Sequence, residues 1–132
     1  TEVRTPTEGR ALSANPRALR VMVRQSMFRR VELLSLRRYA ALAALGGELS
    51  AAAWSAAHEA YLDDYDDFGT GPQARGPALL RIDDSDAEVW VVEQILDDPE
   101  GDHDWRISAE LDVAATDEAG ELVLTVTGLG PT

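Results

Sequence analysis

His103 lies between two carboxylates, Asp102 and Asp104, and this arrangement can orient an imidazole as a general base. The nearest hydroxyl along the following chain is that of Ser108, five residues on and inside a predicted strand, and no Gly-x-Ser-x-Gly sequence surrounds it. The second histidine, His58, is predicted to lie on the surface of a helix. The sequence therefore contains no recognisable catalytic motif, leaves open whether the chain is an enzyme, and predicts no cofactor.

Carboxylates occupy alternate positions around Gly101, and a hard cation such as Ca²⁺ needs several carboxylates that converge. They are Asp98, Glu100, Asp102 and Asp104. A calcium-binding loop counted from Asp98 would have glycine at its sixth position and glutamate at its twelfth, whereas here Gly101 is fourth and Ala109 is twelfth. We therefore predict a solvated hairpin loop, and the four carboxylates are only weak candidates for metal ligands.

The segment 69–77 is rich in glycine and proline and is predicted to be a loop. Backbone amides and a guanidinium in such a loop can hold an anion, and the candidate residues are Gly69, Thr70, Gly71, Arg75 and Gly76. The segment is not a phosphate-binding P-loop, because no Gly-Lys-Ser/Thr sequence follows and the next predicted element is a strand. It is either an anion site or a structural connector.

Charge is divided unevenly along the chain. Residues 1–45 contain nine of the twelve arginines and three glutamates, a sum of +6, whereas residues 46–132 contain three arginines and 21 acids, a sum of −18. The arginines of the first part that could act together are Arg20, Arg24, Arg29, Arg30, Arg37 and Arg38. They could contact phosphates without sequence specificity, or they could pair with carboxylates of the acidic part or of another domain.

Length and composition narrow the class of protein. A chain of 132 residues suits one domain, and its 45% hydrophobic content favours a folded core in spite of a net charge of −12. The absence of cysteine excludes disulfides and zinc–thiolate sites. No apolar run approaches the roughly 20 residues that cross a bilayer. We expect a cytoplasmic protein that does not associate with membranes.

Helices are predicted in the first half of the chain. Residues 1–14 show no period and are predicted to be an extended arm, after which Asn15 and Pro16 form a good helix start. Hydrophobic residues then recur at helical spacing as far as the glycines at 46–47, which predicts one amphipathic helix or a kinked pair. A second helix is predicted for 50–68.

Strands are predicted in the second half, where the hydrophobic period changes to two. They span 78–82, 89–96, 105–113 and 122–126. Because their connections, including 116–120, are short and rich in turn residues, we expect an antiparallel meander with helices packed on its apolar face, an α+β fold. The domain would span 15–130, with helices in 15–68 and the sheet in 78–128. The three tryptophans, Trp54, Trp90 and Trp105, are predicted to be core residues.

Several strings of residues resemble a known family. They are VRQSMFRRVEL at 23–33, GTGP and ARGP at 69–77, QILDDP at 94–99 and GDHDW at 101–105. Together they resemble the C-terminal domain of unknown function of actinobacterial DEAD/DEAH-box superfamily II helicases. The resemblance implies a non-catalytic accessory domain of an ATP-dependent RNA helicase, whose partners would be the motor domains or RNA. It transfers no catalytic residue, because the motor motifs are not in this sequence.

A second resemblance concerns architecture alone. Helices followed by a curved meander look like the cystatin-like cone of nuclear transport factor-type proteins, a fold that hosts binding modules and some isomerases. The alternative function is therefore a stand-alone small-molecule-binding or isomerase-like protein. A deep pocket with an inward-facing carboxylate and histidine would favour it, and a filled core would favour the accessory domain. Sequence-specific DNA recognition is not expected from either.

Overall fold

The computed structural model describes residues 11–132. Most of the predicted arm, residues 1–14, therefore lies outside the described residues. The last part of the predicted arm is not extended, since Leu12–Ala14 forms a single 3-10 turn, η1. This turn is held to a distant part of the chain, because the backbone N–H and the hydroxyl of Ser13 both donate to the carboxylate of Asp117, at 2.8 Å and 2.6 Å.

The first predicted helix is a kinked pair, α2 (Pro16–Ser35) and α3 (Tyr39–Ala44). Helix α2 begins where the sequence predicted, because the Asn15 side chain accepts from the N–H of Ala18 at 3.1 Å. It ends because Arg37 takes a left-handed conformation (φ 57°), so that the N–H groups of Arg37 and Arg38 bond back to the last turn of the helix. The chain then turns into α3.

Helix α4 (Ala51–Asp64) follows, with Ser50 as its N-cap. It ends four residues before the predicted end at residue 68, and Tyr65 leaves the helix in an extended conformation. The segment that follows α4 returns to the sheet, since Phe68 is buried and the N–H of Gly69 donates to the carbonyl of Asp97 at 2.9 Å.

The sheet is an antiparallel meander of four strands in the order β1-β2-β3-β4, which confirms the predicted α+β class. The strands are β1 (Leu80–Asp83), β2 (Val89–Ile95), β3 (Trp105–Asp112) and β4 (Leu124–Pro131). The first strand starts two residues later than predicted, because Pro77–Leu79 forms a 3-10 turn, η2. The last strand runs to Pro131, beyond the predicted edge of the sheet at residue 128.

The connection between β3 and β4 contains a helix, α5 (Val113–Ala119), where the sequence predicted only a turn. Asp112 caps this helix by accepting from the N–H of Ala115 at 3.0 Å, and Gly120 ends it with φ 74°. The short alanine-rich segment between these two caps is long enough for two turns of helix. The predicted strand 105–113 and the predicted turn 116–120 contain the two cap residues, Asp112 and Gly120.

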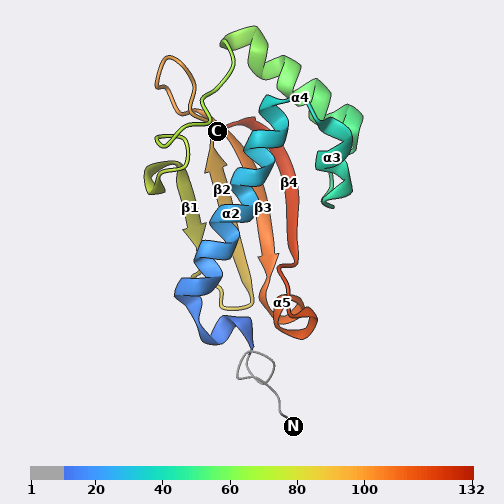
Figure 1. Ribbon diagram of the computed structural model, residues 1–132, viewed down its shortest axis with the longest axis vertical. Helices are drawn as coiled ribbons and strands as arrows, with labels where there is room; N and C mark the ends of the chain where they lie inside the picture. Colours follow the sequence, from blue (N-terminus) through green and yellow to red (C-terminus); the bar gives the residue numbers. More distant parts are fainter. Residues whose placement is uncertain (1–10) are drawn as a thin grey trace.

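Helix α2 crosses one face of the sheet, and α3 and α4 lie beside its upper part (Figure 1). The strand residues that face α2 alternate with outward-facing polar ones, so that Ile107, Ala109 and Leu111 are buried while Glu110 is exposed. All three tryptophans are buried, as predicted. The core therefore lies between α2, α4 and one face of the meander.

The register of β3 can be tested by two neighbouring substitutions. We expect Leu111→Ala to lower the free energy of unfolding by about 2–5 kcal/mol, because Leu111 is fully buried. Glu110→Ala should change it by less than about 0.5 kcal/mol, because that side chain is in solvent. Urea denaturation of both variants measures the difference, and equal losses would mean that the alternation along β3 is wrong.

Candidate functional site

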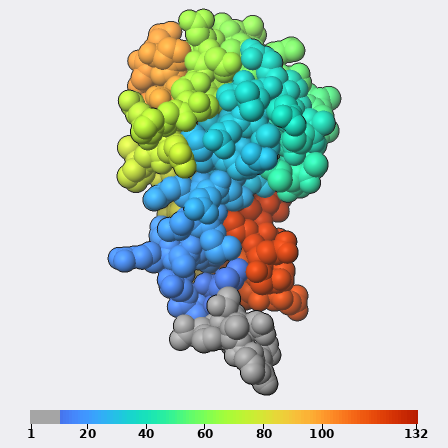
Figure 2. All heavy atoms as spheres, viewed as in Figure 1, coloured from blue at the N-terminus to red at the C-terminus, as the bar shows by residue number. Residues whose placement is uncertain are grey.

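The side of α2 that faces away from the sheet forms the middle of one molecular face, bordered by the segment that precedes β1 and by α3 (Figure 2). This is where the arginine-rich surface was predicted. The six predicted arginines do not form one surface there. Two are paired within the chain, one is buried, and three are exposed.

Arg20 and Arg37 are the paired arginines. The guanidinium of Arg20 bonds to the carboxylate of Asp84 in the turn after β1 and lies 5.4 Å from the ring centroid of Trp90. Arg37 Nη1 lies 3.5 Å from Asp67 Oδ2, beyond the end of α4. Both side chains link α2, or the bend that follows it, to another part of the fold, so part of the predicted intramolecular pairing is present.

Arg30 points into the structure and is only 4% exposed. Its Nη1 donates to the carbonyl oxygen and to the hydroxyl of Ser26, one turn earlier, at 3.0 Å and 2.7 Å. Burial lowers the pKa of Arg30, because the charged guanidinium loses part of its hydration. Although the sequence grouped Arg30 with the contact residues, this side chain cannot reach an external partner in this conformation.

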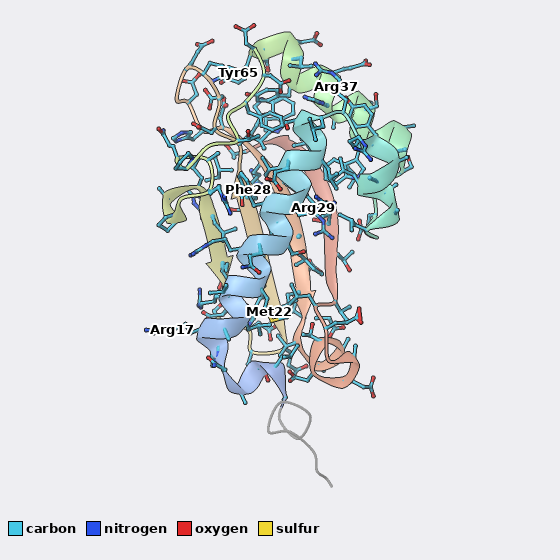
Figure 3. The ribbon with its side chains drawn as sticks, in the orientation of Figure 1. Arg17, Met22, Phe28, Arg29, Arg37 and Tyr65 are labelled. Atoms are coloured by element: carbon cyan, nitrogen blue, oxygen red, sulfur yellow. The ribbon has the colours of Figure 1, made fainter. Side chains whose placement is uncertain are left out.

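Arg24, Arg29 and Arg38 are exposed, as is Arg17 near the start of α2. No carboxylate of residues 11–132 lies within ion-pair distance of any of these four guanidinium groups. Arg17 and Arg29 project on opposite sides of α2, Arg17 on the side of β1 and Arg29 on the side of α3 and β4 (Figure 3). The structure therefore leaves the outer side of α2 positively charged.

The predicted anion loop is folded mainly by its own backbone. The N–H of Gly69 donates to Asp97, that of Arg75 to Gly71, and that of Gly76 to Gln73. These three amides are thus engaged inside the protein. The side chain of Arg75 does face solvent, and its guanidinium carbon lies 5.1 Å from the ring centroid of Phe28 on α2. Arg75 is therefore the group of this loop best placed to meet an anion.

The other side of the loop is acidic. Gly69 lines an open depression of about 520 Å³ together with Asp67, Asp97, Asp98 and Glu100. A Cβ atom on Gly69 would lie 2.8 Å from Asp97 Oδ2, so a larger residue here would require the Asp97 carboxylate to move. Four carboxylates around one depression repel an anion, and Arg75 is not among the residues that line it.

Asp98 organises the loop between β2 and β3. Its buried carboxylate accepts from the backbone N–H groups of Glu100, Asp102 and His103 at 3.1, 2.9 and 2.7 Å. Burial alone would raise the pKa of Asp98, but the three N–H donors outweigh it, so the pKa lies below its ordinary value. The sequence predicted Asp98 to be a solvated charge or, more weakly, a metal ligand. Its structural role in the loop was not predicted.

Among residues 11–132, the remaining candidates for metal ligands do not form a common site with Asp98. The Tyr65 hydroxyl lies 2.8 Å from a carboxylate oxygen of Asp102 and 2.8 Å from one of Asp104, whereas Glu100 is exposed. These two carboxylates raise the pKa of Tyr65 by hydrogen bonding to its hydroxyl. Within residues 11–132, no three histidine or carboxylate side chains are placed to hold a metal ion together.

His58 is fully buried, which corrects the prediction that it lies on a helix surface. Its Nδ1 lies 2.9 Å from the hydroxyl of Tyr39 on α3, and its Nε2 lies 3.4 Å from Asp67 Oδ1. Because a carboxylate only accepts, Nε2 carries a proton, and in the neutral imidazole Nδ1 accepts from Tyr39. No pattern in the sequence indicates this network, because Tyr39, His58 and Asp67 are separated by 19 and 9 residues and come from different segments of the chain.

Comparison with known protein families gives a match over almost the whole chain. The family model described as a domain of unknown function, DUF3516, matches residues 1–129. The chain belongs to the DUF3516 family. No curated protein and no solved structure shows a significant match to it. Within the described part of this DUF3516 domain, no helix has the length and the apolar character needed to cross a membrane.

The role of Asp98 in the DUF3516 domain predicts a dependence of stability on pH. We expect Asp98→Ala to lower the free energy of unfolding by about 1–3 kcal/mol, because three backbone donors lose their acceptor. Since the pKa of Asp98 is lower in the folded state, this contribution is complete above the ordinary value of 3.8 and is lost as the pH falls through the folded-state pKa. Denaturation at several pH values measures it.

The matched control for this test is Glu100→Ala, an exposed carboxylate in the same loop. It should change the free energy of unfolding by less than about 0.5 kcal/mol. If the difference between the wild type and Asp98→Ala stayed constant down to pH 2, the carboxylate would not hold the loop in the way described.

A second prediction concerns the buried histidine. We expect Tyr39→Phe to lower the free energy of unfolding by about 1–3 kcal/mol, because it leaves Nδ1 of His58 buried without a partner. Glu59→Ala, at the exposed neighbouring position of α4, serves as the control. Thermal melting of both variants tests this, and equal melting temperatures for Tyr39→Phe and the wild type would remove His58 from the groups that hold α3 against α4.

Proposed function

We propose that this DUF3516 domain is a non-catalytic accessory domain of an ATP-dependent DEAD/DEAH-box RNA helicase, and that it contacts the RNA backbone through the outer side of α2. The observation that carries this proposal is the exposure of Arg24, Arg29 and Arg38 without a carboxylate partner among residues 11–132. The chain contains 24 acidic residues, so carboxylates are abundant. Exposed arginines that pair with none of the carboxylates in residues 11–132 are suited to bind an external anion.

The expected contact is with phosphates rather than with bases. Guanidinium groups bind phosphate oxygens through a planar fork of N–H donors, and such contacts add affinity without reading sequence. Helix α2 presents Arg24 and Arg29 at a fixed spacing along its axis, and Arg38 follows at the start of α3. We therefore expect no sequence specificity and a strong dependence on salt concentration.

Docking onto the motor domains is the second arm of the proposal, and the acidic depression supports it. Asp67, Asp97, Asp98 and Glu100 gather around one hollow at the end of the molecule where α4 ends. A basic surface of a neighbouring domain would be attracted to this end and would be repelled by α2. The two arms are compatible, because they use opposite charges on different parts of the surface.

The small-molecule-binding alternative receives less support from the packing. The space between α2, α4 and the sheet is occupied by side chains such as Trp54, Tyr61 and Met27, which are buried almost completely. The one histidine buried there, His58, is engaged with Tyr39 and Asp67. The proposal accordingly includes no cofactor, and it places the protein in the cytoplasm with the helicase.

The test is a titration of a single-stranded RNA oligonucleotide at several salt concentrations. We expect weak binding, because the net charge is −12, with a log–log slope of roughly 0.7 for each phosphate that is neutralised. The triple variant Arg24→Ala, Arg29→Ala, Arg38→Ala should lower the slope by about 2 and should weaken all sequences equally. Its free energy of unfolding should change little, since the three side chains are exposed.

The control is Arg81→Ala, because Arg81 is an exposed arginine whose neighbours in β1, Leu80 and Ile82, face the core. It should bind RNA as the wild type does. An absence of RNA binding even at low salt, together with a loss of stability in the triple variant, would decide against RNA contact and in favour of a packing role for these arginines.

A further inference from the structure

We propose that Arg75 completes a row of phosphate-binding guanidinium groups with Arg17 and Arg24 along one flank of α2, and that this row follows the backbone of a single RNA strand. This inference rests on the proposed RNA contact and deepens it. It joins two features that the sequence presents separately, the arginines of the first helix and the glycine-rich loop some 50 residues later.

The flank is defined by helical spacing. Arg17, Arg20, Arg24 and Phe28 follow one another at intervals of three, four and four residues, so they lie on one side of α2. Arg20 does not belong to the proposed row of phosphate-binding groups, because its guanidinium bonds to Asp84 and lies over the ring of Trp90. With a rise of 1.5 Å per residue, the distance along the axis from Arg17 to Phe28 is roughly 16 Å.

Arg75 occupies the position above Phe28. Its guanidinium carbon is 5.1 Å from the centroid of the phenylalanine ring, one helical turn beyond Arg24. The ring is only 5% exposed, whereas Arg75 itself is in solvent. At this point on the flank the residue of α2 is Phe28, so the helix itself provides no charge there. The loop supplies the missing charge.

The guanidinium of Arg75 is held in place before any ligand arrives. Ala74 is buried in the core, and the N–H groups of Arg75 and Gly76 bond to Gly71 and Gln73, which fixes the backbone on both sides of the arginine. Contact with the aromatic ring restrains the side chain and uses one face of the guanidinium plane. The N–H donors at the edge of that plane stay available for a phosphate.

A nucleic-acid strand fits this row better than an acidic protein segment does. Three charges fixed along a rigid helix and an anchored loop match a ligand whose negative charges repeat regularly, as phosphates do. The protein's own carboxylates provide a comparison, because none in residues 11–132 lies within ion-pair distance of Arg17, Arg24 or Arg75. An acidic peptide is therefore the competing ligand that the experiment has to exclude.

The experiment measures binding of a labelled oligouridylate to the 132-residue chain from about 20 mM to about 200 mM salt. We expect Arg75→Ala to lower the log–log salt slope by roughly 0.7 and to weaken binding about fivefold to tenfold near 50 mM salt. Arg75→Lys should keep the slope, because the charge is retained, and should bind more weakly than the wild type, because lysine lacks the planar fork. Arg81→Ala is the matched control and should equal the wild type.

The outcomes separate this inference from the function on which it rests. If the triple variant of Arg24, Arg29 and Arg38 lowers the slope while Arg75→Ala does not, the row is wrong and RNA contact through α2 stands. If neither variant changes binding, both proposals fall. If a polyglutamate peptide competes with the RNA at equal charge concentration and depends equally on Arg75, the ligand is an acidic protein segment and the assignment to RNA is overturned. Unchanged melting temperatures confirm that the variants are folded.

Discussion

The packing of α2 onto one face of the meander is the interaction on which the other features depend. Val23, Met27 and Leu34 are completely buried in this interface, and together they supply several kcal/mol of hydrophobic stabilisation. A helix that buries one side must leave the opposite side in water. The same packing therefore sorts the arginines of α2 into buried and exposed ones, and it decides which of them can meet a partner.

The segments after α4 and after β2 meet at one end of the sheet, and both are rich in acidic residues. Such a concentration of negative charge opposes folding, and the structure compensates locally. Asp98 is surrounded by backbone donors, Asp67 faces both His58 and Arg37, and Tyr65 contacts two carboxylates. The acidic end is thus built from specific hydrogen bonds as well as from solvated charge.

Local patterns predicted much of the fold. Asn15 and Ser50 start helices as expected, and the alternation from Trp105 onwards defines β3 with its buried and exposed sides. Helix α5 was not predicted, because a helix of two turns is too short to show a helical period in its hydrophobic residues. The end of α2 was also ambiguous, because it depends on a left-handed arginine at position 37, a conformation that no sequence pattern demands.

The sequence by itself determined the α+β class, the order of the first helices and the four strands, and the separation of a basic first part from an acidic second part, because these follow from short-range periodicity and composition. Tertiary structure alone decided how the side chains combine. It buried Arg30 and His58, gave Asp98 three backbone donors, and placed Arg75 over the ring of Phe28. The contacts of His58 and Arg75 join residues from different elements, and the burial of Arg30 and the path of the loop around Asp98 depend on how the helices and loops pack on the sheet, which periodicity does not encode.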